Sequence, residues 1–454
     1  MESLKVVLIG AGSATFGRGT IADLVGSEEL RDFDLTISLV DIDGKALKRM
    51  HALGLLIKQH YKSKAEIEAF EDRRAALPGA DYVIISVAQR RWELWEKDYY
   101  IPLAFGFRHV FGETAGPGAA FHTLRSLRLM IPICRDIEEL CPDALLINFS
   151  NPESRVCLGI TRLTSLRNVG LCHGPFGTLK RIAEILQKPE TEIDLTVAGI
   201  NHFHWALQIR DKASGRDLAP EIKARINDYD WDADSLTPLM YAVFGYLTYP
   251  APSHPGEYVN FAYDVAGPKF IQWGLGQVSR KFGARASDAD YVGEGKSGRR
   301  AYELWSAEHA QSIDRIVAGT DPLTEEFTAT TAELAVPIIC DIELDRNRTE
   351  LSANVLNDSA ITNLPSDAIV EVPIRVSAEG IRPIEVGPLP EAIAGICNLQ
   401  VSIQKLIVEA YRQKSKHLLL QALVIDPITD SVERAQQMME FMLKAQSGYL
   451  PELD

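Results

Sequence analysis

The sequence predicts an α/β protein, with a doubly wound parallel sheet in its first part and a second lobe of mixed α+β structure. An apolar segment at 5–9 runs directly into a glycine-rich turn and a helix-like stretch. Two further strand-like segments follow at 35–40 and 80–88, with helical periodicity between them. From about residue 196 the pattern changes to longer helical segments mixed with strands. We therefore expect one domain over 1–195 and a second, catalytic domain over 196–454.

The composition is that of a globular protein and excludes some partners. The chain has 454 residues, 46% of them hydrophobic, and a formal net charge of −15. Such a negative charge disfavours binding to nucleic acid or to an anionic membrane, because both need a basic surface. The six cysteines show no paired spacing, and the N-terminus has neither a basic leader nor a long apolar segment. We expect a cytoplasmic protein with reduced thiols.

The first predicted strand ends in "IGAGSATFG", a turn typical of dinucleotide-binding proteins. Gly10 allows a tight turn, and Gly12 allows the backbone to approach a pyrophosphate held at the N-terminus of the following helix. Thr15 stands where the third glycine of the G-x-G-x-x-G pattern would be. The turn alone therefore leaves a plain strand–turn–helix connection equally open.

The end of the second predicted strand favours the dinucleotide interpretation. "LTISLVD" is apolar and ends in Asp41. A carboxylate at this position accepts hydrogen bonds from the adenosine ribose hydroxyls and repels the extra phosphate of NADP. With a third strand at 80–88, the βαβαβ order indicates a Rossmann-type sheet that binds NAD at the carboxyl ends of its strands.

Three later strand-like segments also end in polar residues. Each ending has an ordinary explanation, because free cysteines are usually buried, Asn-Pro is a common turn and a histidine can cap a loop. Their occurrence at successive strand ends points instead to a shared site. The residues are Asn148, Asn151 and Pro152 in the first, Cys172 and His173 in the second, and Asn201, His202 and His204 in the third.

The Cys and His residues at these strand ends suggest a metal site. A thiolate and an imidazole from neighbouring strands can hold one divalent cation and leave positions open for substrate and water, as catalytic metal sites do. The thiolate suits softer metals, whereas an open site completed by oxygen ligands suits manganese.

The order of these motifs resembles glycoside hydrolase family 4, the NAD- and metal-dependent glycosidases. The resemblance covers nearly the whole chain. It rests on "LIGAGS", "GETAGPG", "NFSNPESR", "LCHGPFGT", "GINHFHW" and the late segment "RPIEVGPLPEAIAGIC". The resemblance implies a hydrolase of carbohydrate metabolism that forms oligomers, either dimers or tetramers.

The mechanism implied by the resemblance is oxidation, elimination and addition. Hydride passes from C3 of the sugar to NAD, a base removes the proton on C2, and the aglycone leaves C1. Water then adds and the hydride returns, so NAD is recycled. A divalent metal, expected to be Mn²⁺, acts as a Lewis acid at the C2 and C3 oxygens.

The resemblance also implies roles for individual residues. Cys172 and His202 match the two metal ligands. His173 follows the metal cysteine, where members that cleave phosphorylated sugars have an acidic residue. We therefore expect unphosphorylated α-glycosides as substrates, with His173 as a proton donor or substrate contact. The remaining matches are Asn151 with Asn148 for substrate hydroxyls, and Gly10, Gly12, Ser13 and Asp41 for the cofactor.

The C2 base is expected in "APSHPGEYVNFAYD", residues 251–264. The candidates are His254, which we favour, then Tyr258, and further Tyr263 and Asp264. A tyrosine needs its pKa lowered considerably to act as a base, whereas a histidine does not.

The substrate class is expected from the loop after the third predicted strand, "AQRRWELWEKD". Arg90, Arg91, Trp92 and Trp95 offer a fork for a carboxylate and a face for a sugar ring, although solvated arginines and packing tryptophans are equally compatible. The segments "LCHGPFGTLKRIAEIL" and "GPGAA" resemble the α-galacturonidase and α-glucuronidase branch of the family, which implies α-galacturonides or α-glucuronides as substrates, with α-glucosides or α-galactosides as the near alternative.

Two alternatives from other classes remain open. A malate- or lactate-type NAD dehydrogenase would share the sheet, but it would need an Asp–His pair in place of the metal ligands. A non-catalytic NAD sensor would not need three polar strand ends. Elsewhere, 368–386 alternates like a β-hairpin, and 302–317 has helical periodicity.

Overall fold

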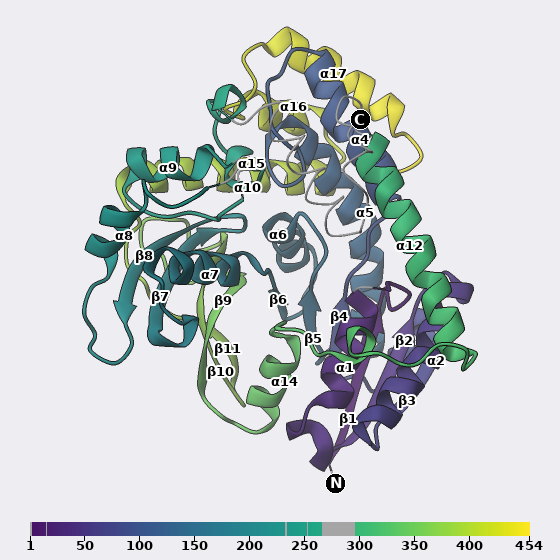
Figure 1. Ribbon diagram of the computed structural model, residues 1–454. Coiled ribbons are helices and arrows are strands. Elements are labelled where there is room, and N and C mark those ends of the chain that lie inside the picture. Colours follow the sequence, from purple (N-terminus) through teal and green to yellow (C-terminus); the bar gives the residue numbers. More distant parts are fainter. Residues whose placement is uncertain (1, 15, 232–233, 252, 266–295) are drawn as a thin grey trace.

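The computed structural model describes residues 2–14, 16–231, 234–251, 253–265 and 296–454, with the side chains of 296–304 left out. Thr15 therefore lies outside the described residues. Among the described residues, eleven strands form one sheet in the order β3-β2-β1-β4-β5-β6-β9-β10-β7-β8, and β11 pairs with β10 (Figure 1). The strands are β1 Ser3–Ile9, β2 Asp34–Val40, β3 Glu66–Phe70, β4 Tyr82–Ile85, β5 Leu145–Asn148, β6 Asn168–Gly170, β7 Ile193–Ile200, β8 Phe203–Asp211, β9 Arg348–Leu356, β10 Ile369–Ser377 and β11 Gly380–Pro383.

The first six strands are parallel and confirm the predicted fold class. Their order, 3-2-1-4-5-6, is that of the Rossmann fold. Alternate residues of β1 enter different cores, with Val6 and Leu8 on one face and Val7 and Ile9 on the other. Both faces are thus buried, as the unbroken apolar strands require.

The remaining strands extend this sheet with antiparallel pairs. β9 pairs with β6, β10 with β9 and β7, and β7 with β8. The predicted hairpin at 368–386 is confirmed as the antiparallel pair β10 and β11. The expected domain division at 195/196 falls inside β7, and the sheet is continuous across it. The division into two domains therefore stays a prediction.

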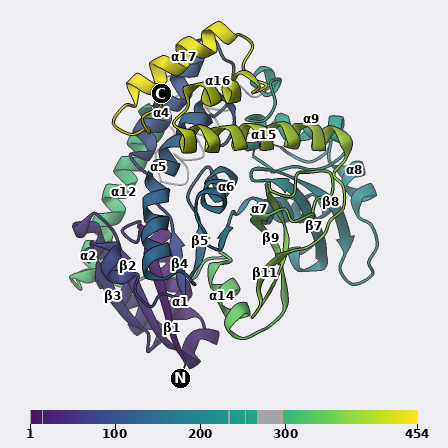
Figure 2. The ribbon, with the colours of Figure 1, turned by 180° about the vertical axis from the view of Figure 1, so that it is seen from behind.

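Helices cover both faces and the upper end of the sheet (Figures 1 and 2). In Figure 1, α15, α16 and α17 lie at the upper end with α4 and α5, and share one apolar core with them. The helices are α1 Phe16–Gly26, α2 Gly44–Tyr61, α3 Arg73–Ala76, α4 Arg91–Ala104, α5 Gly116–Leu140, α6 Glu153–Leu163, α7 Gly174–Leu186, α8 Ala219–Arg225, α9 Leu236–Phe244, α10 Ser253–Gly256, α12 Lys296–Val317, α13 Glu325–Thr328, α14 Ala335–Glu343, α15 Glu391–Gln413, α16 Lys416–Val424 and α17 Val432–Ala445, with short 3₁₀ helices η1 Glu29–Asp32 and η2 Glu190–Glu192.

Two features of the helices bear on the predictions. The helix expected at 302–317 is part of α12, which packs beside α2 through an ion pair between Arg49 and Asp314 that contains two hydrogen bonds.

Within the described part of the chain, no helix combines the length and the apolar character that crossing a membrane requires.

Candidate functional site

The predicted dinucleotide turn lies at the carboxyl end of β1, between β2 and β4. Gly10 has φ +93°, and a Cβ there would lie 2.1 Å from the Ser86 carbonyl oxygen, so only glycine fits. The Gly12 amide donates to Asp41 Oδ2 at 2.8 Å, which places the predicted ribose carboxylate directly against the turn. Gly17 brings α1 close to the turn, since a Cβ would lie 2.2 Å from the Ala11 carbonyl oxygen. This set fits a dinucleotide without the third glycine of the motif.

Ser13, the fourth expected cofactor residue, begins the approach to α1. Its hydroxyl accepts a hydrogen bond from the Phe16 amide at 3.1 Å, which supports the first turn of the helix. Ser13 therefore lies at the helix N-terminus, where a pyrophosphate is expected to bind.

Cys172 and His202 both lie near the ring of Tyr249. A Cβ on Gly174, two residues after Cys172, would lie 2.4 Å from the Tyr249 ring, so Tyr249 packs on the turn that follows β6. The Tyr249 ring centroid is 5.6 Å from that of His202. His202 occupies the short turn between β7 and β8 with φ +63°. The two predicted metal ligands thus face the same part of the structure.

Burial disfavours the charged form of both expected ligands. Burial raises the pKa of the Cys172 thiol well above its usual range, and the Glu371 carboxylate raises it further. Burial also lowers the pKa of His202, so its imidazole is neutral, the form that binds metal. A thiol in this setting becomes a thiolate when a positive charge arrives beside it.

A third potential ligand atom, the amide oxygen of Asn201, supports the fit. Asn201 is 1% exposed, and its Oδ1 has no hydrogen-bond partner among the described residues. Its Nδ2 donates to Glu371 Oε1 at 3.3 Å. In the described part of the chain no three His, Cys, Asp or Glu side chains form a closed metal cluster. A cation here would keep open positions, which is the arrangement of a catalytic site.

The neighbouring histidines have other partners. His204 Nδ1 lies 2.8 Å from Glu371 Oε2, and its Nε2 lies 2.9 Å from Thr178 Oγ1, so both ring nitrogens are occupied. His173 is more exposed, and its Nε2 lies 2.7 Å from Glu333 Oε1. The structure therefore places His173 at the rim of the site, paired with a carboxylate.

The two asparagines of the Asn-Pro motif differ in their surroundings. The Asn148 amide is fully buried and holds its own loop, donating to Ser150 O at 3.0 Å and to Glu153 Oε1 at 2.7 Å. Asn151 is partly exposed, and its carbonyl oxygen accepts from Ser126 Oγ at 2.8 Å. Of the two, Asn151 has the side chain more accessible to a substrate, and both roles stay predictions.

Of the favoured C2 bases, His254 lies beside the expected metal ligand. The His254 ring stacks on the His202 ring with centroids 4.1 Å apart, and burial lowers the pKa of His254 to about 4. Tyr258 is 1% exposed, and its hydroxyl donates to the Asn201 carbonyl oxygen at 2.7 Å. Burial raises the pKa of Tyr258 well above its usual range, which disfavours a tyrosinate base.

The two weaker base candidates contact a surface arginine. Arg108 pairs with the Asp264 carboxylate, and its guanidinium lies 4.8 Å from the Tyr263 ring centroid. This arrangement accounts for both side chains without a role in proton transfer.

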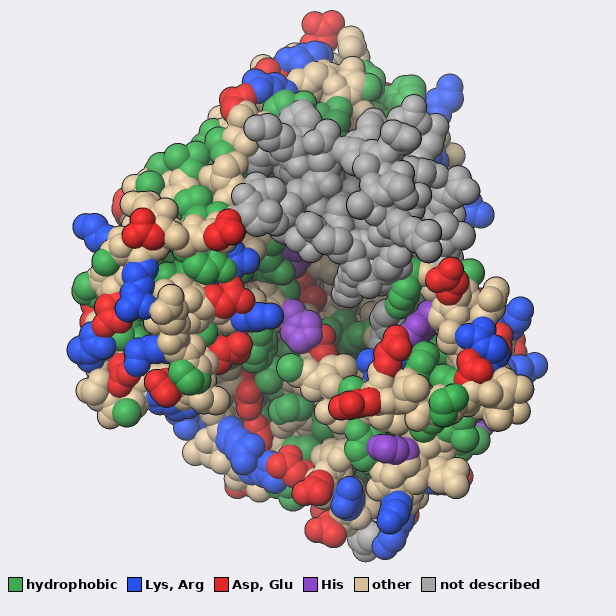
Figure 3. Space-filling model, in the orientation of Figure 1, with side chains coloured by type: hydrophobic (Ala, Val, Ile, Leu, Met, Phe, Trp, Pro, Cys, Tyr) green, Lys and Arg blue, Asp and Glu red, His purple; other side chains and the backbone are tan. Residues whose placement is uncertain are grey.

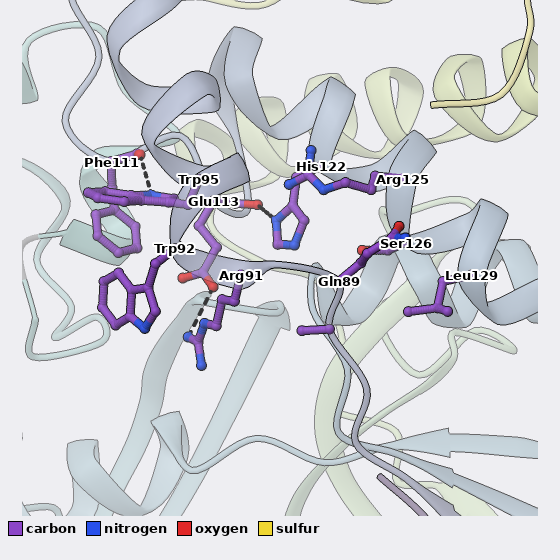
Figure 4. A pocket seen from close by; sticks show the side chains of 11 residues that line it. Gln89, Arg91, Trp92, Trp95, Phe111, Glu113, His122, Arg125, Ser126 and Leu129 are labelled. Carbon is purple, nitrogen blue, oxygen red and sulfur yellow. Dashed lines mark hydrogen bonds and ion pairs between the residues drawn. The ribbon is translucent and has the colours of Figure 1, made fainter. Parts of the chain in front are cut away.

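A pocket opens between the loop after β4 and α5 (Figure 4). It encloses about 530 Å³, including its opening to solvent. Figure 4 shows Trp92, Trp95 and Phe111 on one side and Arg91 reaching the Glu113 carboxylate, with a nitrogen–oxygen distance of 3.3 Å. The lining residues are Ala88, Gln89, Arg91, Trp92, Trp95, Phe111, Glu113, His122, Arg125, Ser126 and Leu129.

This pocket lies next to the paired histidines, and it contains Arg91 but not Arg90. The Phe111 ring in its wall lies 6.1 Å from the His254 ring. Arg90 pairs with Glu93 at 3.0 Å and lies 5.8 Å from the Tyr449 ring, outside the pocket lining. In the view of Figure 3 the surface is hollowed near its middle, with histidine and carboxylate side chains at the margin.

Several residues around this site were not predicted. Glu113 and Thr114 lie within a motif that the sequence singles out, but no role follows from their spacing. Glu257 accepts three backbone hydrogen bonds from that motif. Among these residues, only Glu371 could have been found from the sequence. A single carboxylate in the apolar segment "AIVEVPIRV" indicates that the side chain is buried against a polar partner.

Comparisons with known proteins identify the family. Residues 5–188 match the family model described as "Family 4 glycosyl hydrolase", and residues 197–429 match "Family 4 glycosyl hydrolase C-terminal domain". An α-glucosidase of Erwinia rhapontici is 29% identical, with 98% of each chain covered. An α-galacturonidase of Lachnoclostridium phytofermentans is 26% identical, with 100% of this chain and 98% of that protein covered.

A solved structure supports the fold. The 6-phospho-α-glucosidase from gut microorganisms, in complex with NAD and Mn²⁺, superposes with a TM-score of 0.80 at 21% identity, and 100% of both chains is covered. The family models together span nearly the whole chain, and the chain belongs to family 4 of the glycosyl hydrolases.

Proposed function

We propose that this protein hydrolyses unphosphorylated α-glycosides with NAD and a divalent cation, Mn²⁺, as cofactors. The observation that carries the proposal is that Cys172 and His202 both lie near Tyr249, with the unpartnered Asn201 Oδ1 beside them. The relative solved with NAD and Mn²⁺ supports the same pair of cofactors. Membership of a hydrolase family favours net hydrolysis over the dehydrogenase and sensor alternatives.

We assign some side chains to binding of the cofactor and the cation, and others to proton transfer. When bound, NAD accepts and returns a hydride, and the cation polarises the sugar oxygens. Gly10, Gly12 and Asp41 would hold the cofactor, and Cys172 with His202 would hold the cation. The glycine turn, Asp41 and Cys172 follow parallel strands at their carboxyl ends, where Rossmann-type sheets bind ligands, whereas His202 follows the antiparallel strand β7.

His254 is the side chain we propose as the C2 base. Because its pKa is lowered to about 4, it is neutral near pH 7 and can accept a proton. Its Nδ1 lies 2.9 Å from Ser253 Oγ, which leaves Nε2 as the acceptor. His173, whose Nε2 lies 2.7 Å from Glu333 Oε1, is proposed as proton donor to the leaving group or as a substrate contact.

The substrate class depends on the Arg91–Glu113 pair. Two arginines line the pocket, and Arg91 is the exposed one that a uronate carboxylate would bind, because Arg125 is buried against Asp98. Glu113 already neutralises Arg91, and Trp92 and Trp95 offer ring faces to any sugar. We propose α-galacturonides or α-glucuronides first, with α-glucosides or α-galactosides as the second choice. Relatives of both kinds support keeping both.

Turnover of 4-nitrophenyl α-glycosides tests the proposal. The panel contains α-galacturonide, α-glucuronide, α-glucoside, α-galactoside and a 6-phosphorylated α-glucoside, each with NAD, Mn²⁺ and a reductant. We expect nitrophenol release that requires both cofactors, with deuterium at C2 of the sugar when the reaction runs in D₂O. Steady accumulation of NADH without sugar release would refute hydrolysis, and a preference for the phosphorylated sugar would refute the substrate class.

Two variants sharpen this test. Cys172→Ser should abolish metal-dependent turnover and leave NAD binding unchanged. Arg91→Met should raise KM for a uronide at least tenfold, because a charge-assisted hydrogen bond contributes roughly 1.5–3 kcal/mol, and should change KM for a neutral glycoside little. Arg90→Met is the matched control, because Arg90 lies outside the pocket lining.

The proposal includes an assembly and a location. We propose a cytoplasmic homo-oligomer, a dimer or tetramer, on the strength of the family resemblance. Light scattering of the purified protein measures the first, and a protein that is monomeric at every concentration would refute it. The six free cysteines support a reducing compartment.

A further inference from the structure

The loop at 113–115 is held in place by one buried carboxylate. Glu257 is 1% exposed and accepts hydrogen bonds from the backbone amides of Glu113, Thr114 and Ala115 at 3.0, 2.6 and 2.7 Å. Glu257 follows α10 in the chain, whereas the loop precedes α5. Three N–H groups on one carboxylate fix both the position and the orientation of this loop.

The loop directs one side chain at the expected metal ligand. Thr114 Oγ1 lies 3.0 Å from His202 Nδ1, and the two residues are 2% and 6% exposed. His202 Nε2 has no hydrogen bond to a described residue. With a cation on Nε2, the neutral imidazole carries its proton on Nδ1 and donates it to the Thr114 hydroxyl oxygen. The His254 ring, stacked at 4.1 Å, restricts rotation of the imidazole.

We infer that Thr114 is a positioning residue that orients His202 toward the cation, and that Glu257 holds Thr114 in place. The inference rests on the proposed metal site. Histidines that bind metals usually donate their second ring N–H to a neighbouring acceptor, and this contact fixes the tautomer and the ring orientation. His204 provides the contrast, because Glu371 and Thr178 occupy both of its nitrogens.

Binding of Mn²⁺ to the NAD-saturated protein, measured by the electron paramagnetic resonance of free Mn²⁺, tests the inference without turnover. Thr114→Val keeps the branched shape and removes the hydroxyl. We expect it to weaken Mn²⁺ binding by about 10–100-fold, the usual effect of losing such a partner. Thr114→Ser should restore the affinity, because it returns the hydroxyl. Thr178→Val is the matched control, since it removes the same type of contact from His204 and should leave the Mn²⁺ affinity unchanged.

The outcomes separate this inference from the function on which it rests. If the wild-type protein binds no Mn²⁺, or if Cys172→Ser binds it equally well, the proposed metal site is wrong. If Cys172→Ser loses the metal while Thr114→Val keeps wild-type affinity, the metal site stands and the role of Thr114 is overturned.

A second variant tests the anchor. Glu257→Gln keeps the shape of the side chain but puts an amide group against a backbone N–H. We expect weaker Mn²⁺ binding with NAD affinity retained, because the glycine turn lies on other strands. Equal loss of NAD and Mn²⁺ affinity would indicate that Glu257→Gln is generally unfolded. In that case the affinities of Thr114→Val and Thr114→Ser for Mn²⁺ decide whether Thr114 positions His202. Unchanged Mn²⁺ affinity in a folded Glu257→Gln protein would refute the anchoring role.

Discussion

His109 is predicted to make the protein lose stability as the pH falls below 6.5. The side chain is 1% exposed, its Nε2 lies 2.8 Å from the Tyr99 carbonyl oxygen, and burial lowers its pKa from 6.5 to about 4. Because the folded-state pKa is the lower one, the unfolded chain binds the proton more readily. The contribution of the neutral His109 to the free energy of unfolding is therefore complete above pH 6.5, and it is lost as the pH falls toward 4.

The size of this effect follows from the two pKa values. Between 6.5 in the unfolded chain and about 4 in the folded protein, linkage predicts a loss of about 2 kcal/mol at pH 5 and about 3 kcal/mol at pH 4. His109 also packs under the loop that carries Thr114, since a Cβ on Gly112 would lie 2.6 Å from its ring. Protonation should thus loosen the loop that faces His202, the proposed metal ligand.

Urea unfolding at pH 7 and pH 5, followed by tryptophan fluorescence, measures the effect. His109→Gln can still donate to the Tyr99 carbonyl but does not titrate. The free energy of unfolding of the wild type, relative to that of the variant, should fall by about 2 kcal/mol when the pH is lowered from 7 to 5. His417→Gln, at an exposed position on α16, is the control and should show no such change. An equal difference at pH 7 and pH 5 for His109→Gln would show that His109 does not resist protonation.

Two further predictions concern carboxylates. Asp41→Ala should weaken NAD binding roughly 10–100-fold and reduce the preference for NAD over NADP, because it removes charged hydrogen bonds to the ribose and the repulsion of a phosphate. Isothermal titration with both nucleotides measures this, and Asp43→Ala, which removes only the cap of α2, should behave as wild type. Asp98→Ala should lower the free energy of unfolding by about 3–5 kcal/mol, because it leaves the buried Arg125 guanidinium without its 2.6 Å partner. Asp98→Leu combined with Arg125→Met should recover most of that loss, and failure to do so would show that the pair contributes more than mutual neutralisation.

The parallel part of the fold was predictable because its signal is local. Continuous apolar segments ending in glycine or Asp41 indicate buried parallel strands and their ligand-binding ends. β3 was missed because "EIEAF" is a short edge strand with alternating charges, which carries little apolar pattern. The third predicted strand, at 80–88, is shorter in the structure, where β4 covers Tyr82–Ile85.

The candidate site was predictable only where its residues end strands. Cys172 and His202 carry that local signal. Thr114 and Glu257 are 143 residues apart, and they meet through backbone amides that any residue type could supply. Tyr249 gives no signal either, because its position depends on how the chain returns across β8. Contacts of this kind require the tertiary structure.

The sheet topology explains why the two expected metal ligands belong to one site. Cys172 follows β6, the last parallel strand, and His202 follows β7, which reaches β6 only through β10 and β9. Asn354 of β9 lies opposite Gly170 of β6, while Glu371 of β10 lies opposite Gly199 of β7 and contacts both Asn201 and His204. The strands inserted between the ligands come from residues 348–377, far along the chain. A fragment ending at residue 195 would therefore keep the NAD turn and Cys172 but lose both His202 and the strands that position it. We therefore expect dinucleotide binding and metal binding to be separable in this chain, with only metal binding dependent on the antiparallel extension of the sheet.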